Sequence, residues 1–125
     1  MSTYTEPMRP LEFLVSEANG RRSREQVTLT AAQGDLVAGM VLAKVTATGN
    51  YVPYDDDNNT AVPGSGVAAG VLAYGVSNSA STQLVTIIAR DAEVQASLLA
   101  WEASNDSTEI ANGKADLATA GIVCR

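Results

Sequence analysis

The sequence predicts one mainly β domain with short helices, preceded by an extended N-terminal arm. The chain has 125 residues, the size of a single hydrophobic core, and 46% of them are apolar. Short segments rich in β-branched and aromatic residues alternate with glycine-containing turns, which is typical of β proteins. The formal net charge of −6 lies entirely after residue 30, because the acidic and basic residues before it cancel. We therefore treat the first thirty residues as a separate segment.

Residues 1–30 form the predicted arm, and residues 31–125 form the predicted β-rich body. Within the arm, residues 11–15 are strand-like, Asn19-Gly20 is a turn signal, and residues 27–30 alternate with the period of a half-buried strand. The two strand-like segments could pair as a ribbon. We expect the arm to be flexible when the protein is free.

Three strand regions are predicted in the body. Residues 40–54 read as a hairpin around the turn signal Gly49-Asn50. Residues 67–76 form a strand with small residues, where two backbones can approach closely. Residues 84–89 are apolar on both faces, which predicts a central strand that is covered on both sides.

Helical patterns appear only in the last quarter of the chain. Val94, Leu98 and Trp101 are spaced so that they share one face of a short helix, where Trp101 is expected in the core. Asp106 and Glu109 have the spacing of a capping box, which predicts the start of a second helix. A last strand is expected after it.

Composition excludes several classes of protein. An acidic chain repels phosphate, so nucleic acid is not an expected partner. The chain has no histidine and a single cysteine, Cys124, which excludes histidine-based catalysis, histidine metal ligands and an intrachain disulfide. The start of the chain lacks the pattern of a signal peptide, and the longest apolar stretch, residues 67–76, is too short to cross a membrane. We expect synthesis in the cytoplasm and no membrane span.

The acidic loop over residues 55–59 partly matches a calcium-binding pattern. Asp55, Asp57 and Asn59 occupy the first, third and fifth positions of an EF-hand-like loop. Thr60 stands where the sharp turn needs glycine, and Gly66 stands where a bidentate glutamate is needed. The sequence therefore favours a solvated turn, and no metal ligand is predicted.

Residues 21–24 contain three arginines, which could bind phosphate. Glu17 and Glu25 lie close in sequence and reduce the positive field, so a solvated turn or an ion-pairing patch is the favoured interpretation. No nucleophile with a base and no paired carboxylates in a pocket can be assembled from the sequence. We predict neither an enzyme nor a cofactor.

Several segments, in order and spacing, resemble the head decoration protein D family of lambda-type tailed phages. The resemblance covers about residues 36–125, and the arm is similar to that of the non-lambda branch of the family. The segments that carry it are residues 12–20 (EFLVSEANG), 68–73 (AAGVLA), 81–86 (STQLVT), 98–104 (LLAWEAS) and the tail 106–124.

The resemblance implies a fold of the β-clip type and assembly as a homotrimer. It also implies a place on the outer capsid surface of the virion, at threefold and quasi-threefold positions. There the trimer would bind after the shell expands and would stabilise it against the pressure of packaged DNA. The major capsid protein is then the expected partner.

We expect the arm to make the capsid contact by adding a strand to an exposed sheet edge of the major capsid protein. One arm would bind weakly, because the free-energy cost of ordering its backbone nearly cancels the gain from burying its side chains. Three arms on one trimer would raise the overall affinity. The predicted contact residues are Leu11, Glu12, Phe13, Leu14, Val15, Val27 and Leu29.

An alternative comes from residues 36–42, which also look like the glycine-containing turn of sugar- and ice-binding domains with the β-clip fold. This alternative predicts a β-clip module that binds a small, sugar-type ligand in a polar pocket. The decoration interpretation predicts an apolar interface between subunits instead.

Overall fold

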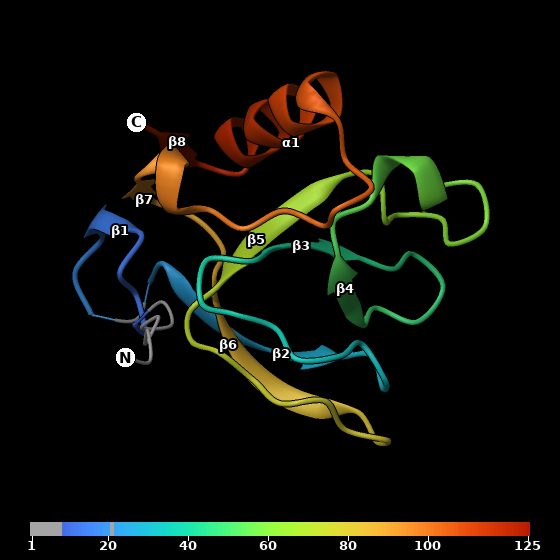
Figure 1. Ribbon diagram of the computed structural model, residues 1–125. Helices are drawn as coiled ribbons and strands as arrows, with labels where there is room; N and C mark the ends of the chain where they lie inside the picture. Colours follow the sequence, from blue (N-terminus) through green and yellow to red (C-terminus); the bar gives the residue numbers. More distant parts are fainter. Residues whose placement is uncertain (1–8, 21) are drawn as a thin grey trace, which may run out of the picture.

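The computed structural model describes residues 9–20 and 22–125, and it is mainly β (Figure 1). The described strands are β1 (Leu14–Glu17), β2 (Arg24–Leu29), β3 (Val41–Lys44), β4 (Tyr51–Pro53), β5 (Ala68–Leu72), β6 (Gln83–Ile88), β7 (Ala92–Val94) and β8 (Ile122–Cys124). The helical segments in this part of the chain are the 3-10 turns η1 (Asp56–Asn58) and η2 (Ala96–Leu98) and the helix α1 (Ser107–Thr119). None of the helices in the described ranges is long and apolar enough to span a membrane.

Five strands close into a barrel in the order β2-β4-β3-β5-β6. The longest pairing is antiparallel, between β2 and β6, and runs from Arg24 opposite Ile88 to Leu29 opposite Gln83. By contrast, β2 and β4 are parallel and pair only through Leu29 and Tyr51. β2 is therefore paired along its whole length with β6, but it is joined to β4 at a single residue pair.

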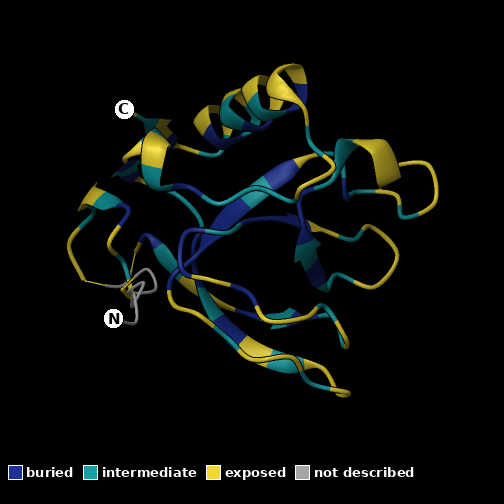
Figure 2. Cartoon of the chain, viewed as in Figure 1, coloured by how far each residue is buried: buried dark blue, intermediate teal, exposed yellow. Residues whose placement is uncertain are grey.

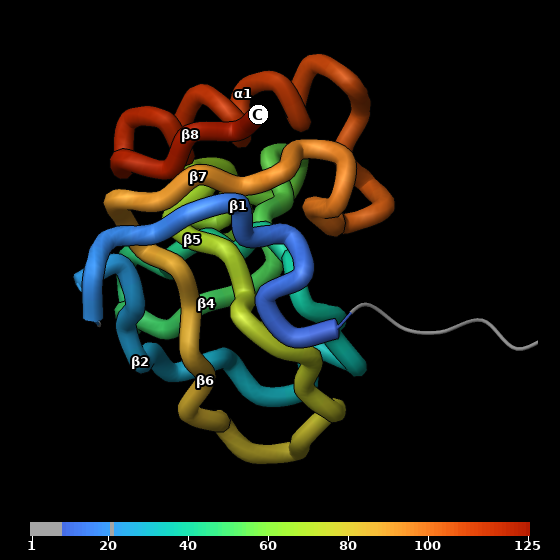
Figure 3. The backbone as a smooth tube through the Cα atoms, turned by 90° about the vertical axis from the view of Figure 1, so that its left-hand side faces the viewer, coloured from blue at the N-terminus to red at the C-terminus, as the bar shows by residue number. Residues whose placement is uncertain are grey.

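A second sheet of three strands has the order β1-β7-β8 and lies over one end of the barrel (Figure 3). β1 is antiparallel to β7, and β8 is parallel to β7. Helix α1 runs beside this sheet and over β5 (Figure 1). This arrangement brings the two ends of the described chain to the same sheet.

Two hydrophobic clusters form the core, and buried positions follow the inner faces of the strands (Figure 2). One fills the barrel and includes Leu29, Leu42, Leu72, Val85 and Ile87. The other lies between the barrel, the second sheet and α1, and includes Phe13, Tyr54, Val94, Leu117 and Ile122. Trp101 packs against the second cluster, with its ring edge-on to Tyr54 at 5.9 Å. This agrees with the core role predicted for Trp101.

The described part of the predicted arm is built into the body. β1 pairs with β7, and β2 supplies a full strand of the barrel, so the two segments do not form a ribbon with each other. The boundary after residue 30 therefore does not separate two structural units. Charge balance suggested that boundary, but pairing with strands more than fifty residues away determines where these segments lie. Residues 1–8 of the predicted arm are outside the described residues.

Two further expectations differ from the structure. The strand predicted over residues 84–89 is not covered on both sides, because the side chain of Leu84 is 71% exposed on the outer face of the barrel. The short helix predicted through Val94 is absent: β7 ends at Val94, and only the turn η2 follows. Val94 pairs with Leu14 on one side and Cys124 on the other, so sheet pairing overrides the helical spacing.

The hairpin and the second helix are confirmed. β3 and β4 pair antiparallel, with Leu42 opposite Pro53. Helix α1 begins with the full capping box, since Asp106 and Glu109 each accept a hydrogen bond from the backbone N–H of the other. β8 follows the helix as expected.

Candidate functional site

The predicted capsid-contact residues lie in or beside β1 and β2: Leu11, Glu12, Phe13, Leu14, Val15, Val27 and Leu29. Phe13, Val27 and Leu29 are buried in the two core clusters. Leu11 and Leu14 pack partly against the core. Glu12 and Val15 are exposed, Val15 by 54%. In this fold, Glu12 and Val15 are thus the most accessible of the seven to a partner.

β1 is an edge strand. It is hydrogen-bonded to β7 on one side, and on its other side no strand of the described chain is paired with it. An unpaired edge presents backbone N–H and C=O groups to which a further strand can add. The outer face of this sheet is polar near β7, because Glu93 accepts hydrogen bonds from Ser16 at 3.2 Å and from Arg125 at 2.7 Å. The edge itself is the feature that a partner strand can use.

The turn from β1 to β2 is held together by Glu17. Its carboxylate accepts hydrogen bonds from the hydroxyl of the fully buried Ser23 and from Arg24, whose Nε lies 3.0 and 3.2 Å from the two oxygens. The hydrogen bond from Arg24 lowers the pKa of the Glu17 carboxyl, and it outweighs the opposing effect of burial. This network fixes the end of β1 relative to the barrel.

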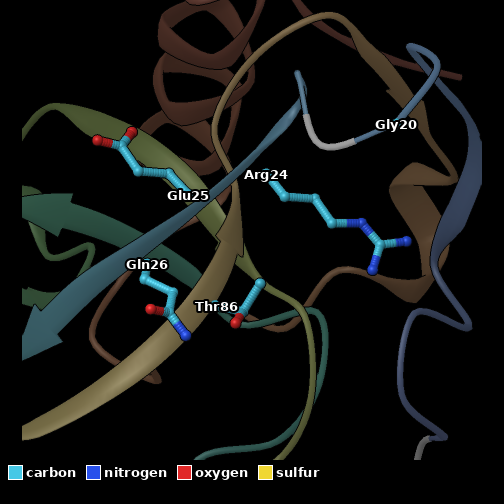
Figure 4. Close-up of a pocket in the computed structure, with 5 residues that line it drawn as sticks. All are labelled: Gly20, Arg24, Glu25, Gln26 and Thr86. Atoms are coloured by element: carbon cyan, nitrogen blue, oxygen red, sulfur yellow. The ribbon is translucent and has the colours of Figure 1, made fainter.

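Beside this turn is an open groove of about 520 Å³, lined by Gly20, Arg24, Glu25, Gln26 and Thr86 (Figure 4). The Arg24 side chain extends towards the turn, and Glu25 projects from the opposite side of β2 (Figure 4). Glu25 is paired with Arg90 at 2.7 Å. The charged side chains of the groove therefore already have partners within the protein.

The ion-pairing interpretation of residues 21–24 is confirmed for its described arginines. Arg22 lies 3.6 Å from Asp91, and Arg24 is paired with Glu17. Arg21 lies outside the described residues. Paired arginines are poorly placed to attract phosphate. Sequence reasoning named Glu17 as a neighbour of the cluster, but it missed Asp91, and the other named neighbour, Glu25, pairs with Arg90 instead.

The acidic loop does not gather its side chains around one point. Asn59 uses its Oδ1 to accept hydrogen bonds from the backbone N–H groups of Gly64 and Gly66, at 3.1 and 3.0 Å. Asp57 instead faces Glu109 of α1. Within residues 9–20 and 22–125, no group of three or more His, Cys, Asp or Glu side chains is arranged to hold a metal ion.

Glu109 is a buried acid at the start of α1. Glu109 is only 8% exposed, and its Oε2 atom has no hydrogen-bond partner among the described residues. The hydrogen bond from the backbone of Asp106 favours the charged form. Burial and the negative charges of Asp106 and Asp57 outweigh it, so the pKa of Glu109 is raised. The fold therefore disfavours the charged form of Glu109.

The raised pKa of Glu109 predicts a pH-dependent stability. Because the folded state raises the pKa of Glu109 above its unfolded value of about 4.5, its stabilising effect is present below that pH and is lost as the pH rises through the folded value. Replacing Glu109 with glutamine removes this buried negative charge, so it should raise the melting temperature at neutral pH and flatten its pH dependence. Thermal unfolding from pH 4 to pH 8 measures this. Glu12→Gln, at an exposed glutamate, is the control, and an equally steep profile in both variants would disprove the assignment.

Residues 36–42, which suggested a ligand-binding turn, belong mainly to the core. Leu36, Ala38, Val41 and Leu42 are buried. None of the residues in this segment lines the groove at Gly20, and none lines a second cavity whose lining includes Thr30, Asp55 and Glu102. The segment therefore has a structural role here, and the sugar-type alternative gains no support from it.

The fold and surface define a small β-barrel protein with an open strand edge and an ion-paired groove, which is the character of a structural interaction module. A family model for bacteriophage lambda head decoration protein D matches residues 3–122, nearly the whole chain. The chain belongs to this family, as the resemblance indicated. The family consists of structural phage decoration proteins, which are not a class of enzymes, and membership implies association with the phage capsid. A comparison with curated protein sequences finds no significant match.

Proposed function

We propose that this protein binds as a homotrimer to the outside of the expanded phage capsid, at threefold and quasi-threefold positions, and stabilises the shell against the pressure of packaged DNA. The family match over residues 3–122 carries this proposal. The open edge of β1 supports it, because a shell subunit can extend such an edge without unfolding the body.

The contact with the major capsid protein is proposed to form at β1. Phe13, Val27 and Leu29 are buried in the core. These three residues could contact the capsid only if β1 and β2 were to separate from the rest of the fold. Pairing at the outer edge of β1, with Glu12 and Val15 beside it, needs no such rearrangement.

Assembly into a trimer strengthens the binding. β1 has four residues, so an added strand gains only a few hydrogen bonds, each worth about 0.5–1.5 kcal/mol net. One such contact is weak after the cost of association is included. Within a trimer, the second and third contacts become intramolecular, and the overall affinity rises steeply. Oligomerisation is therefore part of the proposed binding mechanism.

Cosedimentation with capsids before and after expansion tests the proposal. We expect binding to the expanded shell and little binding to the unexpanded one. Val15→Lys should weaken binding, because a lysine beside the edge hinders the addition of a strand. Val123→Lys is the matched control: Val123 is also exposed, by 43%, but lies on β8 at the other edge of the same sheet.

Equal binding to both capsid forms would count against a role after expansion. Equal weakening by the two lysine substitutions would place the contact elsewhere than on β1.

A further inference from the structure

The tripeptide Ala-Asn-Gly occurs twice in the chain, and the fold places the two copies in opposite surroundings. Residues 18–20 lie in the turn between β1 and β2, whereas residues 111–113 lie inside helix α1. A basic residue follows each copy in the sequence. Because the neighbours of the two asparagines are so similar, a difference in their reactivity has to arise from the fold.

An asparagine followed by glycine can react within its own backbone. The glycine nitrogen attacks Cγ of the asparagine, a C–N bond forms, and the side-chain amide leaves as ammonia together with the proton of the attacking N–H. Water then opens the resulting succinimide ring at one of its two carbonyls. The product is either aspartate or isoaspartate, in which the backbone continues through Cβ and Cγ. Glycine favours the attack, because it has no side chain and its backbone rotates freely.

The turn between β1 and β2 leaves both reacting groups accessible. Asn19 and Gly20 are exposed, and Gly20 also lines the open groove beside the turn (Figure 4). Gly20 has a φ of +69°, and apart from its chain neighbours no described atom lies within 4 Å of an added Cβ. Neither the side-chain amide of Asn19 nor the N–H of Gly20 is hydrogen-bonded to another described residue. The nitrogen can therefore approach the side chain.

Helix α1 restrains the second copy. Asn112 is also exposed, so access of water does not distinguish the two sites. Inside an α-helix, however, the N–H of each residue is bonded to the carbonyl four residues earlier. Gly113 is buried, and an added Cβ would lie 2.6 Å from the ring of Trp101 and 3.1 Å from that of Tyr54. This glycine is explained by packing, and its nitrogen reaches the Asn112 side chain only if α1 opens.

The turn that holds Asn19 is anchored on both sides. The N–H of Ala18 donates to the carbonyl of Asp91 at 3.0 Å, and the carbonyl of Ser23 accepts from the N–H of Ala89 at 2.8 Å. Isoaspartate adds one atom to the backbone between these two anchors. The extra length has to be taken up by the turn or by the end of β1.

We propose that Asn19 is a site of spontaneous covalent modification, at which the Gly20 nitrogen displaces ammonia and water then converts residue 19 to aspartate or isoaspartate. The isoaspartate form lengthens the turn and disturbs the end of β1. That this disturbance weakens binding to the shell rests on the proposed function, but the reaction itself does not.

Incubation of the purified protein at pH 8 and 37 °C, followed by peptide mass mapping, tests the proposal. A converted peptide gains the difference in mass between a hydroxyl and an amino group, and an isoaspartyl methyltransferase with a labelled methyl donor marks the isoaspartate. We expect Asn19 to react at least about tenfold faster than Asn112, because α1 has to open locally before Asn112 can react. In protein unfolded with urea, the two asparagines should react at similar rates.

Two variants confirm the chemistry at residue 19. Gly20→Ala keeps the asparagine and adds a methyl group to the attacking residue, so in urea it should slow the reaction of Asn19 and leave that of Asn112 unchanged. Asn19→Gln keeps an amide but requires a larger ring, so it should abolish the reaction at this position. Equal rates of Asn19 and Asn112 in the folded protein would overturn the proposal. So would a folded protein in which Asn19 is inert although it reacts in urea.

The two products separate the effect of charge from that of backbone length. Asn19→Asp has the new charge and a normal backbone, whereas the purified isoaspartate form has the same charge and a longer one. We expect the isoaspartate form to melt at a lower temperature than Asn19→Asp and to bind expanded capsids more weakly. Equal melting temperatures would contradict the disturbance of β1. Unmodified protein that does not bind expanded capsids would contradict the proposed function, while the rates at Asn19 would still support the modification site.

Discussion

Replacing Phe13 with alanine is expected to lower the free energy of unfolding by about 3–5 kcal/mol, the usual cost of removing a buried phenylalanine. Phe13 is fully buried and belongs to the cluster between the barrel, the second sheet and α1. Its carbonyl also accepts a hydrogen bond from the N–H of Gln95 at 2.7 Å, so the residue is anchored by backbone as well as side chain. Chemical denaturation of the purified protein measures the effect.

Val15→Ala is the control for this substitution. Val15 lies two residues further along the chain, in β1, but is 54% exposed, so its truncation should change the free energy of unfolding by well under 1 kcal/mol. Equal, small effects of the two substitutions would mean that β1 is detached from the body in solution. In that case residues 1–30 would form a flexible arm in the free protein, as the sequence predicts, and β1 would not be packed against the body.

Gly64→Ala is expected to cost about 3 kcal/mol or more. Gly64 has a φ of +102°, and an added Cβ would lie 2.2 Å from the carbonyl oxygen of Lys44 and 2.9 Å from the backbone nitrogen of Thr46. The contacts are with backbone atoms, which cannot move aside as a flexible side chain can. Strain in φ contributes about 1–3 kcal/mol, and overpacking contributes a similar amount.

Gly34→Ala separates these two contributions. Gly34 has a φ of +79°, but no atom lies within 4 Å of an added Cβ, so only the strain in φ remains. Thermal and chemical unfolding of both variants should show a clearly larger loss for Gly64→Ala. Similar losses would show that the loop after η1 moves away from β3 at little cost.

Local sequence signals predicted the elements whose partners are close in the chain. The hairpin of β3 and β4 is marked by the turn at Gly49-Asn50, and the start of α1 is marked by Asp106 and Glu109. In each case, the residues that specify the element also make its hydrogen bonds. A single sequence is sufficient for such features.

The position of β1 and β2 could not be predicted in the same way. The strand character of residues 11–15 and 27–30 was visible, but their partners β7 and β6 lie far along the chain. The neutral net charge of residues 1–30 suggests an independent arm, but charge carries no information about which strands pair. Val94 shows the same effect. Its spacing from Leu98 and Trp101 predicts a helix, but Val94 is instead paired with strands on both sides in the second sheet.

The candidate sites were predicted only in part. The family was found from short motifs in order, whereas the open edge of β1 depends on strand order, which no motif records. The cavity at Thr30, Asp55 and Glu102 joins positions that are distant in sequence and ordinary when taken singly. Asp55 matches one position of a metal-binding loop in the sequence, but its place in the lining of this cavity depends on the fold.

Cryo-electron microscopy of expanded capsids saturated with the protein tests the central claim most directly. We predict three copies around each threefold and quasi-threefold position on the outer surface, with Phe13 still in the core of each body and the outer edge of β1 paired with a strand of the major capsid protein. Single copies, or bodies from which β1 and β2 have been withdrawn to reach the shell, would contradict the account.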